Sequence, residues 1–294
     1  LLIDDKSTDE TVEIILSYKD PRITLIRKEK NSGYTESLNY GISIAKGKYI
    51  ARMDGDDVVD KYRFEKQINF LERNPTIGVC GSNYDTFPMV KYNQLQEYPK
   101  DIFTFMLFSC EIAHPSVLFR KELFADGTRY NTNKEPAEDY DLWSRLLFKT
   151  KFYNIQEPLL HYRVHSMQVS SSRRQVQQEK SLEARYFIWQ NLLKQNLFSY
   201  SSFKTIFGNN YSGTLEELFS QLQSLDAIGK EVFMHPDLNE ILLQRKISEL
   251  KTFKIRGYFF KNPNLSVSQI PRLVIHFRKY FSFFEILKIF YRSL

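Results

Sequence analysis

Three carboxylates stand within four residues in the segment Asp54-Gly55-Asp56-Asp57. Carboxylates so close together repel one another unless a cation or water neutralises them. Mg²⁺ and Mn²⁺ favour oxygen ligands, and Mg²⁺ is commonly held by one or two carboxylates together with the phosphate oxygens of a substrate. The segment therefore predicts a site for a divalent metal and a phosphate-bearing substrate. A solvated turn is the alternative interpretation, because such strings are common in turns.

The elements that must position this segment are strands that alternate with helices. Apolar and β-branched runs predict strands at 23–26 and 48–53, and helical spacing predicts helices at about 7–18 and 34–45. Such alternation predicts a parallel α/β sheet. In sheets of this kind the ligand lies beyond the carboxyl ends of the strands, and both Asp4-Asp5 and the 54–57 segment follow predicted strands.

The character of the chain changes after Ser170, where few strand signals remain and amphipathic helical patterns dominate. We therefore expect two regions, an α/β domain over 1–170 and a basic, mainly helical region over 171–294. The remaining predicted elements are helices at 62–71, 139–148, 181–197, 214–225 and 277–294, and strands at 77–80 and 116–119.

Several motifs occur together in an order and at spacings that resemble the family 2 glycosyltransferases. They are Asp4-Asp5-Lys6-Ser7-Thr8-Asp9, Asn31-Ser32-Gly33, Gly47-Lys48-Tyr49 leading into Asp54-Gly55-Asp56-Asp57, His114-Pro115-Ser116-Val117, Glu138-Asp139-Tyr140-Asp141-Leu142-Trp143 and Tyr162-Arg163-Val164-His165. The resemblance covers about the first 170 residues. It implies a GT-A-type α/β fold, with a mixed, mostly parallel sheet flanked by helices, ahead of the mostly α-helical C-terminal region.

The resemblance also implies which residues bind the nucleotide sugar. It assigns Asp5, together with Asp4, to the nucleoside base, and Asn31 and Gly33 to the same donor site. A solvated pair of carboxylates that caps the following helix is the alternative for Asp4 and Asp5.

For the metal, the resemblance implies Mn²⁺ or Mg²⁺. Asp54 is expected to face the ribose or the metal, and Asp56 to bind the metal that bridges the two donor phosphates. For His165 a metal or phosphate contact and a purely structural hydrogen bond remain equally open, because imidazole's common role as a metal ligand is the only physical support.

A second pair of carboxylates, Glu138 and Asp139, stands at the start of a predicted helix. An acceptor hydroxyl that attacks the donor sugar needs a base, and we expect Asp139 to fill that role, with Glu138 as the alternative. Attack from the face opposite the leaving group is a single displacement with inversion at the anomeric carbon, which the family also implies. The other interpretation is that both residues only suit the positive end of a helix dipole.

The first residues, Leu1-Leu2-Ile3, read as the end of a buried strand, and family members open with a strand and a helix before the paired aspartates. We therefore expect that the first strand of the fold is missing from this chain and that the enzyme is truncated at its N-terminus. A nucleotidyltransferase and a non-catalytic glycan-binding or scaffolding module of the same fold are the alternative functions.

The net charge of +6 is unevenly distributed. Residues 1–170 carry 23 basic and 25 acidic side chains, whereas residues 171–294 carry 18 and 10. The predicted helix over 277–294 has basic and aromatic faces that suit an anionic membrane surface, where lipid-linked acceptors are found, and packing onto the protein's own core is the alternative. No nucleic-acid-binding motif is present, so nucleic acid is not expected as a partner.

Two cysteines, Cys80 and Cys110, cannot form a disulfide framework, which favours a reducing compartment. We therefore expect a cytoplasmic enzyme, with peripheral attachment to the inner face of the membrane if the 277–294 segment binds lipid. The expected partners are a nucleotide-sugar donor, with a UDP-sugar as the first choice, and a hydroxyl of a surface glycan or lipid-linked acceptor.

Overall fold

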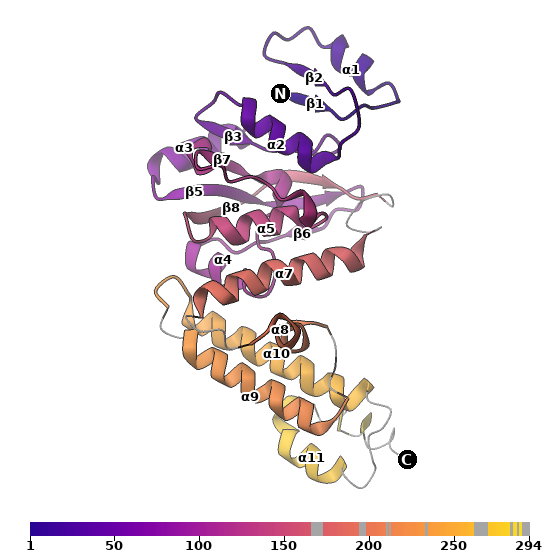
Figure 1. Ribbon diagram of the computed structural model, residues 1–294, viewed down its shortest axis with the longest axis vertical. Coiled ribbons are helices and arrows are strands. Elements are labelled where there is room, and N and C mark those ends of the chain that lie inside the picture. The colour runs from indigo at the N-terminus through magenta and orange to yellow at the C-terminus, as the bar shows by residue number, and fades with distance from the viewer. Residues whose placement is uncertain are drawn as a thin grey trace. The chain divides into compact units, whose positions relative to one another are not determined.

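The computed structural model describes residues 1–165, 173–193, 198–209, 211, 213–232, 235–261, 270–282, 285–286 and 288–289. The chain divides into two compact units, Leu1–Ile188, here called unit 1, and Trp189–Leu294, here called unit 2 (Figure 1). The boundary predicted between residues 170 and 171 lies outside the described residues and stays a prediction.

Unit 1 contains the strands and most of the motifs. Its helices and strands are β1 (Leu2–Asp4), α1 (Thr11–Ser17), β2 (Leu25–Arg27), α2 (Tyr34–Ile44), β3 (Tyr49–Ala51), β4 (Val58–Val59), α3 (Arg63–Arg73), β5 (Ile77–Phe87), β6 (Tyr92–Asn93), α4 (Pro99–Phe105), β7 (Leu118–Arg120), α5 (Glu138–Leu146), β8 (Lys151–Arg163) and the greater part of α7 (Arg174–Leu192). Short 3₁₀ helices, η1 (His114–Ser116), η2 (Lys121–Phe124) and η3 (Thr132–Lys134), precede and follow β7.

The strands form two sheets, and the predicted α/β fold with helices on a mixed sheet is confirmed. Strands β1 and β2 pair in parallel, while the larger sheet has the order β3-β7-β5-β8-β4 with β6 beside β5. Among the described strands, β1–β2 and the long β5–β8 pairing are parallel, and the four shorter pairings are antiparallel. The alternation that predicts parallel pairing covers only about the first fifty residues, and β7 then returns between β3 and β5 in the opposite direction.

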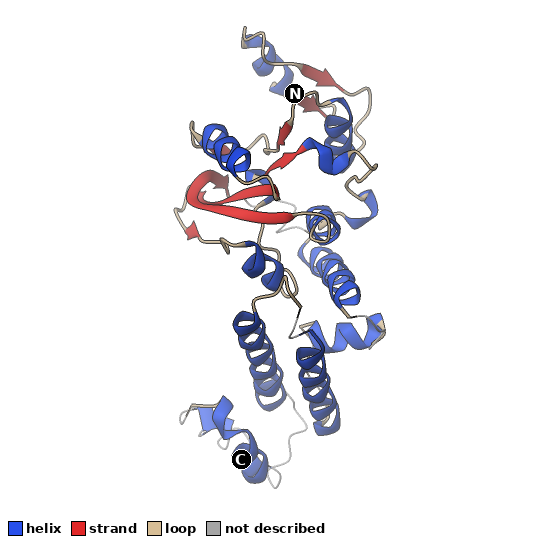
Figure 2. Cartoon of the chain, turned by 90° about the vertical axis from the view of Figure 1, so that its left-hand side faces the viewer, coloured by secondary structure: helices blue, strands red, loops and turns tan. Residues whose placement is uncertain are grey.

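Helices cover both faces of the larger sheet, which Figure 2 shows in red between the helices of unit 1. Successive strand residues point to opposite faces, and Phe152 and Tyr153 on β8 show which helix lies on each. Phe152 contacts Trp143 of α5 edge to face, whereas Tyr153 stacks on Phe70 of α3 with ring centroids 4.1 Å apart. The core of unit 1 therefore lies in two layers, one on each side of the sheet.

Strand β8 is the longest strand in the described part of the chain, and the sequence did not predict it. Its run includes Pro158, which has no backbone N–H to donate to a neighbouring strand and so argues against a central strand. The structure places Pro158 opposite Asn83, next to a register shift in the β5–β8 pairing. A bulge of this kind accommodates a proline inside a long strand.

Unit 2 is helical over its described residues. It contains the end of α7, then α8 (Tyr200–Phe207), α9 (Leu215–Val232), α10 (Glu240–Lys261), α11 (Ile270–Phe277) and the 3₁₀ turn η4 (Arg278–Tyr280). Lys254 of α10 is fully buried, and its Nζ donates to the carbonyls of Thr205 and Gly208 at 2.8 and 2.9 Å. These two hydrogen bonds satisfy carbonyl groups that the C-terminal end of α8 would otherwise leave unpaired.

The segment 277–294 is not one continuous helix. After η4 the backbone at Phe281 is extended, with φ −126° and ψ 142°. Phe277 and Ile289 are buried in an apolar cluster with residues of α9 and α10, and Tyr280, Phe281 and Ile286 pack against the same cluster. The apolar residues of this segment that the structure describes therefore support packing onto the core, the alternative to membrane contact.

In the part of the chain that the structure describes, no helix is both long and apolar enough to cross a membrane.

Candidate functional site

A cavity of about 580 Å³ in unit 1 brings together five of the predicted site residues. They are Asp54, Asp56, Glu138, Asp139 and His165, and the other lining residues are Tyr34, Arg52, Tyr84, Ala113, His114, Pro115, Pro136, Leu160, Tyr162 and Gln177. The carboxylates come from two places in the sequence, the loop between β3 and β4 and the first turn of α5. The size of the cavity is in the range of small-molecule binding sites.

The acidic segment lies directly after β3, where the chain turns toward β4. One carboxylate oxygen from each of Asp54, Asp56 and Asp57 lies within 4.8 Å of the others. Asp57 is the most buried of the three at 6% exposed, and its Oδ1 accepts from the backbone N–H of Arg163 at 2.9 Å. Burial raises the pKa of Asp57 to about 6, and the charges of Asp54 and Asp56 add to this rise against the Arg163 hydrogen bond.

Asp54 is paired with Arg52, two residues before it. Nη1 of Arg52 donates to Oδ2 of Asp54 at 2.9 Å, and Nη2 bonds the other carboxylate oxygen. Burial raises the pKa of Asp54, while the Arg52 guanidinium opposes this rise. The sequence reasoning missed Arg52, although residues two apart in extended chain project to the same side, which could have indicated the pairing.

Asp56 is the most accessible member of the acidic segment, with 45% of its side chain exposed. Nε2 of His165 lies 3.1 Å from its Oδ2. His165 follows β8, the strand that pairs with β4 next to the acidic loop, so the sheet brings residues 109 positions apart into contact. The predicted association of His165 with the acidic segment is therefore present in the geometry, while its role as a metal ligand stays a prediction.

The donor set of this segment fits a hard divalent cation. Three carboxylates supply oxygen atoms at close range, and hard cations such as Mg²⁺ and Mn²⁺ bind such atoms. Among the described residues, Oδ2 of Asp57 is buried without a hydrogen-bond partner, which leaves one acceptor in the segment unsatisfied. Asp54, Asp56 and Asp57 are the residues that could hold the ion, with His165 beside them.

Glu138 and Asp139 begin α5 and line the same cavity. Glu138 is 5% exposed and its Oε2 accepts a hydrogen bond of 2.9 Å from the hydroxyl of Tyr34. Burial, helped by the charge of Asp139, raises the pKa of Glu138 to about 7. Burial also raises the pKa of Asp139, whose Oδ1 accepts from the backbone N–H of Tyr140 at 2.7 Å.

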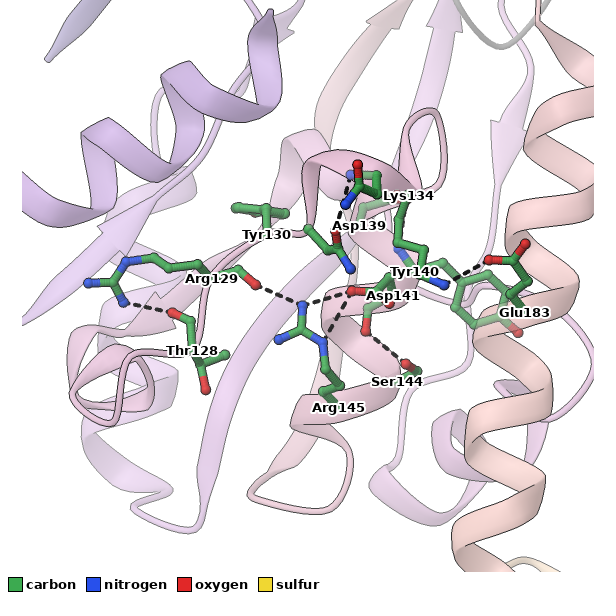
Figure 3. A network of polar contacts seen from close by, with 12 residues as sticks. Thr128, Arg129, Tyr130, Lys134, Asp139, Tyr140, Asp141, Ser144, Arg145 and Glu183 are labelled. Carbon is green, nitrogen blue, oxygen red and sulfur yellow. Dashed lines mark hydrogen bonds and ion pairs between the residues drawn. The ribbon is translucent and has the colours of Figure 1, made fainter.

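The third acidic residue of this motif, Asp141, has a structural role. Figure 3 shows Arg145 between Asp141 and the loop before α5, and its Nη2 donates to Oδ2 of Asp141 at 2.8 Å and to the carbonyl of Arg129 at 2.7 Å. Trp143, on the next turn of α5, is completely buried. These contacts fix the helix whose first turn carries Glu138 and Asp139.

His114 lies in the wall of the cavity. Its Nε2 lies 2.7 Å from the hydroxyl of Tyr130, and the two rings are in contact. Burial lowers the pKa of His114 well below its usual value, and the nearby Arg52 charge adds to this effect. His114 is therefore neutral at physiological pH and contributes hydrogen bonding instead of charge.

Of the five residues predicted to bind the nucleotide sugar, Asp54 lines this cavity, whereas Asp4, Asp5, Asn31 and Gly33 do not. Asp5 accepts from the backbone N–H groups of Ser32 at 3.0 Å and Gly33 at 2.8 Å, and it pairs with Lys28 at 2.6 Å. Partial desolvation acts to raise the pKa of Asp5, but the Lys28 and backbone hydrogen bonds together lower it.

Asp4 and Asn31 also bond to nearby backbone. Oδ1 of Asp4 accepts from the N–H of Ser7 at 3.1 Å, and Oδ1 of Asn31 accepts from the N–H of Gly33 at 3.2 Å. Asp4, Asp5, Asn31 and Gly33 thus form a separate cluster, here called the donor loop cluster. Their nucleotide-binding roles stay predictions.

Tyr34 joins the donor loop cluster to the cavity, and the sequence reasoning missed it. It follows Gly33 directly, is the first residue of α2, and bonds Glu138 across 104 residues of sequence. The position after a predicted donor-binding glycine was the one available signal. Its partner could not be found from spacing, because the contact depends on how α2 and α5 lie in the folded unit.

Comparison with known proteins places this site in a family. Residues 1–128 match the profile described as Glycosyl transferase family 2. An uncharacterized glycosyltransferase of Haemophilus influenzae is 33% identical over 189 residues, which cover 58% of either chain. An uncharacterized glycosyltransferase of Methanocaldococcus jannaschii is 30% identical over 218 residues, which cover 71% of this chain and 68% of the relative.

An Escherichia coli relative is named UDP-Glc:alpha-D-GlcNAc-diphosphoundecaprenol beta-1,3-glucosyltransferase WfaP, and it is 32% identical over 177 residues, 59% of this chain and 68% of that protein. Among solved structures, S. aureus TarS in complex with UDP-GlcNAc matches with a TM-score of 0.55 at 15% identity, covering 90% of this chain and 83% of that chain. This likeness confirms the GT-A-type fold. Together with the matches in sequence, the acidic segment and the paired carboxylates of α5 lead to one conclusion: the chain belongs to glycosyltransferase family 2.

Proposed function

We propose that the protein is an inverting, metal-dependent glycosyltransferase that moves a sugar from a UDP-sugar to a hydroxyl of a surface glycan or lipid-linked acceptor. The observation that carries this proposal is the position of the two acidic groups. The Asp54–Asp57 segment, with the donor set of a divalent-metal site, and the Glu138–Asp139 pair, with raised pKa values, line one cavity.

The acidic segment would act on the leaving group. Asp54 and Asp56 would hold the metal, with Asp57 and His165 beside it. A bound divalent cation supplies positive charge against the negative charge that builds on the nucleoside diphosphate as the sugar leaves. Arg52 already offsets part of the negative charge of Asp54 in the structure.

Asp139 would act on the acceptor. As the acceptor hydroxyl attacks the anomeric carbon, its proton passes to the carboxylate of Asp139, and the bond between sugar and diphosphate breaks on the opposite face. A base works best when its pKa lies near the working pH, and burial moves the pKa of Asp139 in that direction. Glu138 remains the alternative base.

The donor and acceptor classes rest on the relatives. TarS is described in complex with UDP-GlcNAc, and the name of WfaP gives UDP-Glc as donor and a diphosphoundecaprenol-linked sugar as acceptor. We infer a UDP-linked donor and a lipid-linked glycan acceptor for this chain, with the reaction in the cytoplasm at the inner face of the membrane. Contact of the 277–294 segment with lipid is not part of the proposal, because its described apolar residues pack inward.

The test is donor turnover by the protein with Mn²⁺ or Mg²⁺ and a panel of UDP-sugars, measured as UDP release with and without a lipid-linked acceptor. We expect metal-dependent release that Asp56→Asn reduces by on the order of 100-fold or more. Asp20→Asn is the matched control, because Asp20 is a surface carboxylate that pairs with Arg22 outside the cavity. The proposal is wrong if no UDP-sugar is consumed or if Asp56→Asn is as active as the parent.

A further inference from the structure

A hydrogen bond connects Tyr34, the residue after the donor loop cluster, to the predicted catalytic carboxylates. The hydroxyl of Tyr34 donates to Oε2 of Glu138 at 2.9 Å. Tyr34 is half-buried and Glu138 is 5% exposed, so this bond lies largely away from water, where it is stronger than at the surface. A bond from a neutral hydroxyl to an ionised carboxylate favours the ionised form.

The backbone before Tyr34 is fixed by the donor loop cluster. Gly33 has φ +91°, a left-handed conformation that favours glycine, and it stands immediately before α2. Its N–H donates to Asp5 at 2.8 Å. The same glycine lies close to the segment before α5, because a side-chain carbon on Gly33 would come within 3.6 Å of Oε1 of Glu135. The donor loop and the start of α5 therefore meet at two points, Gly33 with Glu135 and Tyr34 with Glu138.

The carboxylate pair stands among several charged and titratable groups. Glu138 is faced by Tyr34, Glu135 and Asp139. Asp139 is faced by Arg52 and Asp54 as well. Tyr130, Tyr140 and Cys110 also lie near the pair. Tyr34 donates a side-chain hydrogen bond to Glu138, whereas Glu135 and Asp139 repel its negative charge.

We propose that Tyr34 is a positioning residue that ties the donor loop cluster to the Glu138–Asp139 pair and favours the ionised form of Glu138. The inference rests on the proposed function, since it assigns Tyr34 to the same reaction. Tyr34 holds the Glu138 carboxylate in one orientation beside Asp139, and its hydroxyl offsets the repulsion between the two. A donor bound at the donor loop cluster would therefore be linked, through Tyr34 at the start of α2, to the carboxylate pair that contains the base.

The direction of the effect on pH dependence follows from the bond. Tyr34→Phe removes a group that stabilises ionised Glu138, so the pair holds its proton to a higher pH. A proton held by the pair is on Asp139 for part of the time, and protonated Asp139 cannot accept the acceptor's proton. The acidic limb of the kcat profile therefore moves to higher pH by about one unit, which is up to about tenfold in kcat below the pKa.

The first experiment measures kcat and the donor KM of the parent and of Tyr34→Phe in assays run from about pH 5 to about pH 9. We expect kcat to fall severalfold near neutral pH, to recover toward the parent value at the alkaline end, and the donor KM and the melting temperature to stay unchanged. Tyr40→Phe is the matched control, because Tyr40 lies on the same helix with 45% of its surface exposed and does not line the cavity. Its profile should superimpose on that of the parent.

The inference is overturned if Tyr34→Phe and Tyr40→Phe give the same profile as the parent. It is also overturned if Tyr34→Phe loses activity equally at every pH together with a lower melting temperature, because that result indicates a merely structural side chain.

A second measurement decides the inference even if the proposed function fails. The side-chain carboxyl of Glu138 is titrated by ¹³C NMR in glutamate-labelled protein, with Glu138→Gln used to assign its signal. A higher Glu138 pKa in Tyr34→Phe than in the parent supports the role of Tyr34, and equal values overturn it. If the parent consumes no UDP-sugar but the Glu138 pKa is still higher in Tyr34→Phe than in the parent, the proposed function is contradicted and the role of Tyr34 is not.

Discussion

At the scale of single residues, each carboxylate of the acidic segment and of the Glu138–Asp139 pair has its own partner, and these partners make the carboxylates chemically different. Among the described residues, Asp56 is the most exposed of the acidic segment, and its carboxylate lies beside His165, so a metal can reach its oxygens from the solvent. The remaining pairings are Arg52 with Asp54, the backbone of Arg163 with Asp57, Tyr34 with Glu138 and the backbone of Tyr140 with Asp139. Carboxylates from the two acidic segments are thus chemically different from one another, although their side chains are of the same type.

The two candidate bases can be separated by substitution. We expect Asp139→Asn to lower kcat by about 10²–10⁴-fold with little change in UDP affinity, because it removes the base without touching the donor loop. Glu138→Gln should cost less, since an amide oxygen can still accept the Tyr34 hydrogen bond. Steady-state kinetics and UDP binding by calorimetry check both. A larger loss of kcat in Glu138→Gln than in Asp139→Asn would move the base to Glu138.

At the scale of elements, side chains of α3 donate hydrogen bonds to the backbone next to the acidic segment and next to His114. Nη2 of Arg63 donates to the carbonyls of Arg52 at 2.8 Å and Val117 at 3.0 Å. Nε2 of Gln67 donates to the carbonyls of Cys80 and Ser116, both at 2.8 Å. Arg63 and Gln67 are buried, so the four carbonyl groups are paired where water does not reach them.

Gln67→Leu tests how much the hydrogen bonds from α3 contribute to stability. The change leaves two buried carbonyls without their side-chain donor and removes the oxygen that accepts from Nε of Arg63. We expect the free energy of unfolding to fall by about 2–4 kcal/mol, because buried polar groups left unpaired carry their full desolvation cost. Urea denaturation measures this loss. Glu65→Gln, an exposed change on the same helix, should stay within about 0.5 kcal/mol of the parent, and equal stability of the two variants would contradict the assignment.

At the scale of the whole molecule, ion pairs involve part of the basic residues that follow residue 170. Many basic side chains of unit 2 are in ion pairs within that unit, among them Arg245 and Lys246 with Glu249, and Arg256 with Glu285. The aromatic residues between them, such as Phe277, pack in the apolar cluster. The basic and aromatic pattern that suits a membrane surface therefore also describes the surface and the core of a helical unit.

Phe277→Ala distinguishes the two interpretations of the 277–294 segment. Phe277 is 3% exposed and packs with Leu218, Ile255 and Phe259. We expect its removal to lower the free energy of unfolding by about 3–5 kcal/mol and to leave sedimentation with anionic vesicles unchanged. Ile275→Ala, on the same helix with 70% of its surface exposed, is the control and should change neither. Weaker vesicle binding by Phe277→Ala at unchanged stability would instead support insertion into lipid.

The sequence by itself determined the family and predicted several residues that line one cavity. The acidic segment, the Glu138–Asp139 pair and His165 were found from residue types, motif order and resemblance, because these signals are local in the chain. The alternation of strands and helices up to β3 was found for the same reason, since side-chain periodicity reports local structure. The long strand β8 was missed because Pro158 conceals it, and the structure accommodates that proline beside a register shift.

The tertiary structure alone decided which of these residues meet. It separated Asp4, Asp5, Asn31 and Gly33 from the cavity, and it joined Tyr34 to Glu138 across 104 residues of sequence. It also paired most strands antiparallel and turned Phe277 into the core of unit 2. Periodicity shows that a residue belongs to an apolar or polar face, but the partner of that face is set by packing between elements that are distant in the sequence.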